Sequence, residues 1–221
     1  MKWYKPWTWF KKRPSQTRTQ SREQHGQRPF SYLMRVPDLP NLKARYKLDH
    51  KIYFVHVTAG WQNQSATSFM KNFLKRGLCT DFMEDDGAIY SHRDWNKGGS
   101  HLGKAYLNND TKSRKLHSRN GAGIEIACGG KLEAKNGKFY TWFGKEVSQL
   151  DVHYHTDGFY HELMTDKQKA SLARFLKDIK QKHQGIKFYS HDEVSGYRGK
   201  SDVGGALGMS FRKFLELNEL N

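Results

Sequence analysis

Cysteine is scarce in this chain, and long apolar runs are absent. The 221 residues include only two cysteines, Cys79 and Cys128, which form no Cys-x-x-Cys pair. This count excludes a disulfide framework and a cysteine-rich zinc cluster, and it leaves the redox compartment open. No stretch approaches the ~18 consecutive apolar residues of a membrane-spanning helix. We therefore expect a domain that an apolar core stabilises, without a membrane span.

The amino terminus also lacks the pattern of a secretory signal. It reads MKWYKPWTWFKKRP, which is cationic and aromatic, with no uninterrupted apolar run and no small-residue cleavage site. We expect a protein that is made in the cytoplasm and does not use ordinary export.

Acidic residues are in the minority. The chain has 38 Lys and Arg against 22 Asp and Glu, a formal net charge of +16 with a pI near 9.8. A field of this sign concentrates polyanions near the surface. Nucleic acid, anionic membrane and the charged polymers of a bacterial wall all qualify, and charge alone does not choose among them.

The chain divides into two parts by composition. Residues 1–40 are rich in Arg, Lys, Gln, Ser and Pro, and Glu23 and Asp38 are their only acids. Such a segment buries too little apolar surface to fold alone. We predict a basic aromatic extension over residues 1–45 and one domain over 46–221. The extension is either a solvated tail or an anchor whose aromatic rings and cations bind a polyanion or a partner protein.

Strand and helix patterns alternate through the domain. Alternating apolar residues, helical periodicity and turn signals predict these elements: strands over 51–57, 122–128 and 186–190, hairpins over 82–90 and 131–143, and helices over 65–76, 166–184 and 210–218. Local signals mark three boundaries: a capping box from Thr165 to Gln168, a helix cap at Gly77 and a hairpin turn at Asn136-Gly137. Residues 95–121 have no clear period, which predicts a long functional loop. Strands interleaved with helices indicate an α/β fold with a mixed central sheet flanked by helices.

Two histidines stand at the ends of predicted strands. His56 closes an apolar strand, and His191 follows residues 186–190 and precedes a glycine-rich stretch that reaches Asp202. Taken singly, each histidine is more commonly structural. Together with Asp202 they make a two-histidine, one-carboxylate set, and three protein ligands with one open position is the pattern of catalytic zinc.

Four sequence blocks, in order, resemble the type 2 N-acetylmuramoyl-L-alanine amidases, a family that includes phage lysozyme-type amidases and animal peptidoglycan recognition proteins. The blocks are FVHVTAG at 54–60, FMEDDGAIY at 82–90, NGAGIEI at 120–126 and HDEVSGYRGKSDVGGAL at 191–207. The resemblance spans about residues 50–217 and leaves the first 45 residues outside. It implies an amidase-like α/β fold.

The resemblance also assigns roles to residues. His56, His191 and Asp202 fall on the family's zinc-ligand positions. Lys200 falls on its catalytic lysine, and Glu125 falls on the glutamate that some members use as general base. A carboxylate between two isoleucines is costly to bury without a purpose, which favours a functional Glu125.

On the substrate side the resemblance points to His101, Thr58 and Asn120. The chain departs from the family pattern in four places. Val57 stands where the first block of the family has a second histidine, and the fourth block has one extra residue between His191 and Lys200. Val203 and Gly205 replace the prolines that follow the last zinc ligand, and the tyrosine that some members use before the second block is absent. The absence of that tyrosine makes Glu125 the better candidate for the base.

The resemblance implies a zinc-dependent hydrolase that cleaves the amide between N-acetylmuramic acid and L-alanine in peptidoglycan. We expect a phage lysin or a virion-associated enzyme that acts on cell wall, with residues 1–40 as the contact to a phage particle. One alternative is a non-catalytic peptidoglycan-binding module on the same fold. Another is a basic structural or nucleic-acid-binding protein, which ranks last because no nucleic-acid motif accompanies the charge.

Overall fold

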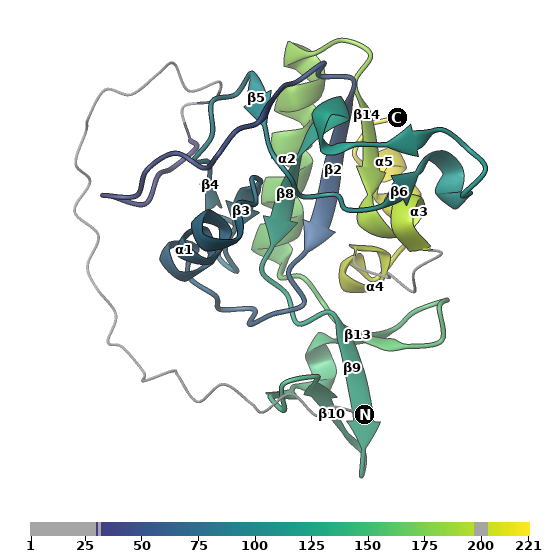
Figure 1. Ribbon diagram of the computed structural model, residues 1–221. Helices are drawn as coiled ribbons and strands as arrows, with labels where there is room; N and C mark the ends of the chain where they lie inside the picture. Colours follow the sequence, from purple (N-terminus) through teal and green to yellow (C-terminus); the bar gives the residue numbers. More distant parts are fainter. Residues whose placement is uncertain (1–29, 31, 197–202) are drawn as a thin grey trace, which may run out of the picture.

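The computed structural model describes residue 30 and residues 32–196 and 203–221. Its centre is a five-stranded sheet in the order β14-β2-β8-β3-β4 (Figure 1). These strands are β2 (Ile52–Val57), β3 (Asp81–Met83), β4 (Ile89–Tyr90), β8 (Gly121–Ile126) and β14 (Lys187–Ser190). The first four strands of that order are parallel, and β4 pairs antiparallel with β3. The mixed α/β architecture predicted from sequence is confirmed.

Helix α2 (Asp166–Lys182) covers one face of this sheet (Figure 1). It begins at the predicted capping box, where the Thr165 hydroxyl accepts the Gln168 amide and the Gln168 side chain accepts the Thr165 amide. Its apolar stripe packs against the inward side chains of β2 and β8, which together form the main core: Tyr53, Val55, Val57, Ile124, Ile126, Leu172, Phe175, Leu176 and Ile179. Helix α5 (Phe211–Leu217) completes this core.

Helix α1 (Ala66–Arg76) packs beside β3 through a second apolar cluster. Its Phe69 ring stacks on Phe82 of β3 with centroids 4.1 Å apart. The helix begins at Ser65, whose hydroxyl caps it, and ends at Gly77, which adopts a left-handed φ of 65°. Both ends agree with the sequence prediction.

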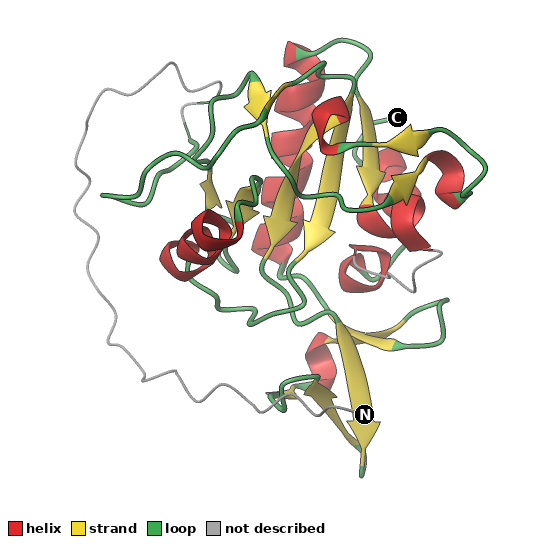
Figure 2. Ribbon diagram, in the orientation of Figure 1, coloured by secondary structure: helices red, strands yellow, loops and turns green. Residues whose placement is uncertain are grey.

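The opposite face of the central sheet is covered mainly by the segment that follows Trp95 and ends at β8. This segment carries short elements (Figure 2): β5 (Lys97–Gly98), β6 (Ala105–Tyr106), η1 (Leu107–Asn109), β7 (Lys115–Leu116) and η2 (Ser118–Asn120). Strand β5 pairs with β1 (Tyr46–Lys47), and β6 pairs with β7. The predicted long loop is therefore subdivided by short antiparallel pairs, which bury Leu102, Ala105 and Leu116 against the sheet.

A second, antiparallel sheet lies beyond the carboxyl ends of β2 and β8 (Figure 1). Its order is β11-β10-β9-β13-β12, and its strands are β9 (Lys131–Lys135), β10 (Lys138–Thr141), β11 (Glu146–Val147), β12 (Val152–Tyr154) and β13 (Tyr160–Glu162), with η3 (Gln149–Asp151) before β12. The β9–β10 hairpin turns at Asn136 and Gly137, both at positive φ, as the sequence predicted. The sequence did not predict the other three strands.

Two short helices flank the undescribed segment 197–202. These are α3 (His191–Ser195) and α4 (Val203–Leu207), neither of which was predicted. Among the described residues, no helix is long and apolar enough to cross a membrane.

The described part of the predicted extension packs on the domain. Leu33, Val36 and Leu42 are buried in the two apolar clusters beside the sheet. The packed part of the chain thus begins before residue 46. Residues 1–29, with most of the predicted anchor, lie outside the described residues.

Candidate active site at the carboxyl edge of the central sheet

His56 and Glu125 lie side by side at the carboxyl ends of neighbouring strands. They are register partners in the parallel β2–β8 pair, so their side chains share one face of the sheet. His56 is buried, whereas Glu125 is partly exposed. This edge is where ligands bind in open α/β sheets, because loops from successive strands meet there.

His191 reaches the same edge from β14. Ser190 pairs with Val55 of β2, and His191 is the next residue and the first of α3. The centroids of the His191 and His56 rings are 4.5 Å apart. The two histidines predicted as ligands therefore lie together, although they are 135 positions apart in the sequence.

His101 joins this pair from the segment between β5 and β6. Its Nδ1 lies 3.2 Å from His56 Nε2, and its Nε2 lies 3.2 Å from the carbonyl oxygen of Gly121. Because a carbonyl only accepts, Nε2 carries the proton, and the Nδ1 lone pair faces His56. Burial lowers the pKa of His101 to about 4, and the charge on His191 adds to this, whereas the Gly121 hydrogen bond opposes it. The ring is neutral at neutral pH.

A missing side chain on β8 makes room for the His101 ring. A Cβ on Gly123 would lie 3.1 Å from two atoms of that ring, closer than ordinary van der Waals contact. The Ser118 hydroxyl accepts the backbone amide of His101 at 3.1 Å and fixes the segment from the other side. The glycine within the NGAGIEI block thus serves the site directly.

Thr58 lies where β2 leaves the sheet, two residues after His56. Its hydroxyl donates to the Cys128 carbonyl at 3.3 Å and accepts the Gly60 amide at 3.2 Å. These bonds tie the loop after β2 to the chain after β8, so Thr58 shapes the edge that carries His56. Direct contact with substrate stays a prediction.

Asn120 lies at the other end of β8 from Glu125. Its Oδ1 accepts the His117 amide at 2.8 Å and closes the η2 turn. Five residues of extended strand span about 16 Å. The structure therefore does not bring Asn120 together with the histidines.

Lys200 and Asp202 lie outside the described residues. Val203, the first described residue after this segment, lies close to α3, because its amide donates to the Asp192 carboxylate at 3.4 Å. Within the described ranges, no group of three His, Cys, Asp or Glu side chains is arranged to hold a metal. The predicted set needs Asp202 as its third member. The two imidazoles already in contact suit zinc as nitrogen donors.

A second group of polar side chains, which the sequence did not single out, lies against α4. His161 is fully buried, and its Nε2 donates a hydrogen bond to the Asp157 carboxylate, 3.2 Å from Oδ2. Its ring lies flat on Gly205, where any side chain would collide with it. Residue 205 must therefore lack a side chain in this packing. His155 lies beside Gly204 and is half buried.

No family model and no curated protein matches this sequence. Solved structures do match its fold. N-acetylmuramoyl-L-alanine amidase LysC from Clostridium intestinale URNW has a TM-score of 0.55 at 16% identity, over 86% of this chain and 98% of its own. N-acetylmuramyl-L-alanine amidase AmiD from E. coli has a TM-score of 0.52 at 16% identity, over 79% and 60% of the two chains. AMPDH3 from Pseudomonas aeruginosa has a TM-score of 0.51 at 15% identity, over 83% and 65%.

Proposed function

We propose that this chain, which has the fold of N-acetylmuramoyl-L-alanine amidases, is a zinc-dependent peptidoglycan hydrolase that cuts the amide between N-acetylmuramic acid and L-alanine. One observation carries the proposal. His56, His191, His101 and Glu125 come from four distant segments and meet at the carboxyl edge of one parallel sheet. AmiD, one of the similar structures, holds anhydro-N-acetylmuramic acid linked to a short peptide.

In this proposal His56, His191 and Asp202 hold the metal. Zinc bound there would supply a Lewis acid and lower the pKa of water to about 7. Glu125, register partner of His56, is placed to accept a proton from the attacking water and return it to the departing amine of L-alanine. Neutral His101, anchored on the Gly121 carbonyl, orients the His56 ring. Lys200 would stabilise negative charge on the carbonyl oxygen of the scissile amide.

The setting we propose is a phage lysin or a virion-associated enzyme, made in the cytoplasm and acting on cell wall. Support comes from the basic aromatic composition of residues 1–40, which suits attachment to a larger particle or to a polyanion. A similar solved structure, LysCS from Clostridium intestinale URNW, is named as an endolysin. An enzyme that acts only on small recycled fragments would gain little from such an extension.

The test is hydrolysis of purified cell wall with detection of new amino-terminal L-alanine. The unmodified chain should release it, and a chelator should stop the release until Zn²⁺ is restored. Glu125→Gln should reduce the rate about 10²–10⁴-fold, because it removes the general base. His191→Ala should abolish both activity and zinc retention.

His117→Gln is the matched control, since His117 is an exposed histidine outside the site. This variant should keep both activity and metal. Release of L-alanine by His191→Ala at the unmodified rate would contradict the metal assignment. Wall binding without any release by the zinc-loaded chain would favour the non-catalytic binding module instead.

A further inference from the structure

Exposed apolar side chains gather around the second sheet. Among the described residues, seven large hydrophobic side chains are exposed. Four of them belong to this sheet and its turns: Trp142, Leu150, Tyr154 and Phe159. A fifth, Trp61, comes from the loop after β2 and contacts the same sheet. Clustered exposed hydrophobic residues on a folded protein mark binding surfaces more often than scattered ones do.

Three of the rings near the loop after β2 form a continuous surface, the aromatic platform, made of Trp61, Trp142 and Phe143. The centroid of Phe143 lies 4.7 Å from that of Trp61 and 5.3 Å from that of Trp142. Trp142 is 70% exposed and Trp61 is 39% exposed. Rings that served only the core would be buried, so the platform is unexplained by folding.

Trp142 is exposed and yet fixed in place. Its indole Nε1 donates to the carbonyl oxygen of Ala59 at 2.6 Å. This bond consumes the only polar group of the side chain and holds the ring, which leaves its apolar face to solvent. A rigid aromatic ring offers contact area without a large loss of side-chain entropy on binding.

The platform lies a short distance along the chain from the candidate active site. Ala59 follows His56 by three residues, which span at most about 10 Å of chain. Gly130, at the start of the second sheet, approaches Ala59 so closely that an added Cβ would lie 3.3 Å from the Ala59 Cβ. A polymer that places one unit at His56 would therefore meet the platform with a neighbouring unit.

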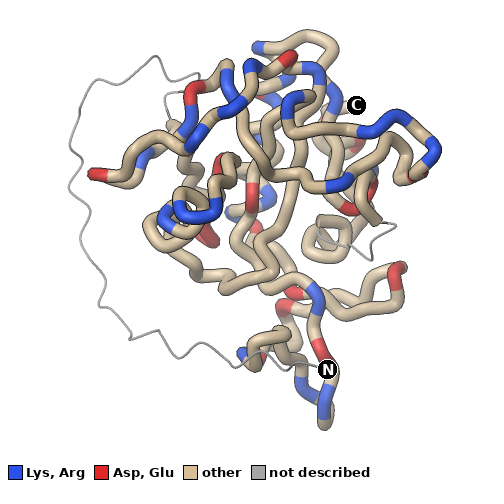
Figure 3. Tube along the Cα trace, viewed as in Figure 1, with Lys and Arg blue, Asp and Glu red and all other residues tan. Residues whose placement is uncertain are grey.

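Charge separates this region from the rest of the protein. Residues 131–162 hold four lysines and five acids, a formal −1, whereas the whole chain carries +16. Lys145, close to the platform in sequence, is paired at 3.5 Å with the buried Glu162. Figure 3 shows acids and bases interspersed in this sheet. The surroundings of the platform suit an uncharged ligand and not a polyanion.

We propose that the aromatic platform binds the glycan strand of peptidoglycan beside the sugar whose amide is cut. The axial C–H bonds of a sugar ring carry partial positive charge, and they pack on the negative faces of aromatic rings. The backbone of alternating N-acetylated sugars is polymeric, and it is uncharged where its lactyl carboxyl groups are still linked to peptide, which matches the local charge and the short chain separation from His56. This proposal rests on the proposed function for the identity of the polymer.

The probe is the uncharged β-1,4-linked hexamer of N-acetylglucosamine, which contains no amide between a sugar and a peptide. Its binding to the full chain is followed by tryptophan fluorescence and by calorimetry, so hydrolysis plays no part in the readout. Trp61→Ala should weaken binding about tenfold, the effect of losing stacking worth ~1.4 kcal/mol. Trp142→Phe should lose part of the affinity, because it keeps a ring but loses the bond to Ala59, and Trp142→Ala should lose more.

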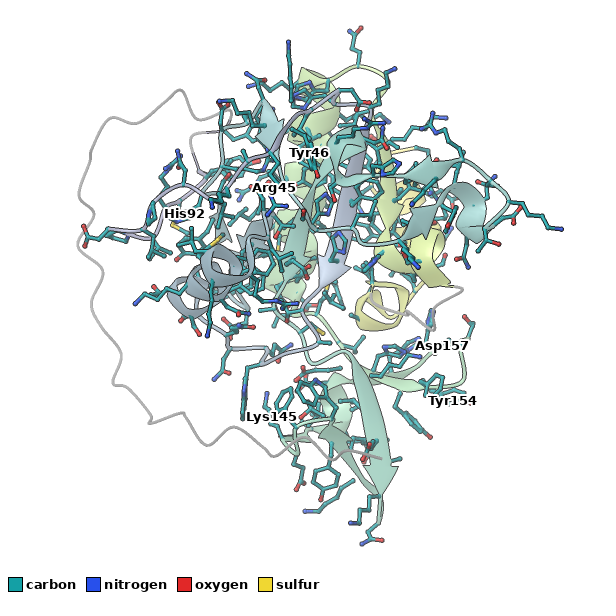
Figure 4. All side chains as sticks on the ribbon, in the orientation of Figure 1. Arg45, Tyr46, His92, Lys145, Tyr154 and Asp157 are labelled. Atoms are coloured by element: carbon teal, nitrogen blue, oxygen red, sulfur yellow. The ribbon has the colours of Figure 1, made fainter. Side chains whose placement is uncertain are left out.

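Tyr46→Ala is the matched control. Tyr46 is also an aromatic residue with 39% exposure, and Figure 4 places it far from Lys145 and the second sheet. This variant should bind the hexamer normally. Thermal unfolding of each variant shows whether it is folded, and Trp61→Tyr, which keeps a ring, should restore binding if the Trp61→Ala chain unfolds.

Several outcomes would overturn the proposal. The proposal fails if the chain does not bind the hexamer, if no platform variant changes that binding, or if salt abolishes it. Self-association that Trp61→Ala removes would identify the surface as a contact between copies of this chain, and stronger binding to anionic vesicles would identify it as a membrane contact. Hexamer binding that depends on the platform in a chain without amidase activity would refute the proposed function alone.

Discussion

Asp81, the first residue of β3, forms a fully buried ion pair with Arg93. Arg93 Nη2 lies 2.8 Å from Asp81 Oδ2, and the Tyr53 hydroxyl donates to the same carboxylate at 2.7 Å. Burial opposes the charge on Arg93, but Asp81 outweighs it and raises the pKa of the guanidinium. Burial and the neighbouring Asp81 also raise the pKa of Tyr53. The Asp81 carboxylate thus links Arg93 and Tyr53 in one buried network.

We expect Asp81→Asn to lower the free energy of unfolding by about 3–5 kcal/mol, because it leaves a buried guanidinium without its counter-charge. Urea unfolding measures this. Asp94→Asn is the control, since Asp94 pairs with Lys97 at 3.6 Å on the surface and should matter little. Equal unfolding midpoints for the two variants would contradict the importance of the buried pair.

Sequence reasoning located some residues of the site and missed others, for a physical reason. His56 and His191 stand at the ends of apolar strands, and strand ends are visible in a local pattern. The contacts of Asp81 with Arg93 and of His161 with Gly205 depend on which strands and helices become neighbours. No local pattern encodes that, so neither contact was predicted.

At the scale of elements, residues 33–42 form a strap that lies along β4 and the chain after it. The Met34 amide donates to the Ile89 carbonyl at 2.8 Å, and the Leu42 amide donates to the His92 carbonyl. Between them the Val36 amide donates to Nε2 of His92 at 2.8 Å. That bond requires an unprotonated Nε2, so docking of the strap depends on a neutral His92.

Burial lowers the pKa of His92 to about 4, and the positive charge of Arg35 adds to this. The pKa of His92 is lower when the strap is docked than in the undocked state, where it is near 6.5. Between pH 6.5 and 4 the undocked state therefore binds more protons than the docked state. Docking should therefore weaken as pH falls from about 6.5 towards 4. We expect the exchange protection of the Val36 amide to fall roughly tenfold between about pH 6.5 and 5.

His92→Gln tests the same element, because a glutamine oxygen accepts the Val36 amide and does not titrate. Its Val36 amide should keep its protection across this range, measured by hydrogen exchange with correction for the intrinsic rate. Parallel loss of protection in both proteins would assign the pH dependence to other groups.

Element boundaries followed from the sequence wherever a local signal sets them. The Thr165 capping box, the Gly77 cap and the Asn136-Gly137 turn each act within a few residues, and the structure confirms them. The order of strands in the second sheet is not local. Strand β9 pairs with both β10 and β13, and β13 is its neighbour only after the chain returns from β12. The strands of the second sheet that were not predicted are short and polar, so they show no alternation of apolar residues from which a strand could be predicted.

At the scale of the whole molecule, charge and the proposed glycan surface occupy different parts of the chain. Residues 1–29 contain eight Lys or Arg and one Glu, a formal +7, and the second sheet carries −1. The remaining residues therefore carry +10. The proposed function and the proposed glycan surface imply two modes of wall binding, one from long-range attraction to anionic wall polymers and one from contact between rings and sugars. Only the first is screened by salt.

Removal of residues 1–29 should separate these modes, since the packed strap begins after them. We expect the full chain to lose affinity for purified wall steeply between about 0.05 and 0.5 M salt, because screening shortens the reach of its charge. The shortened chain should bind more weakly at low salt and depend less on salt. Co-sedimentation with wall measures both slopes, and hydrolysis of a soluble muropeptide should be similar for the two chains. Identical salt slopes would show that residues 1–29 do not contact the wall, and loss of muropeptide hydrolysis would show that they belong to the catalytic domain.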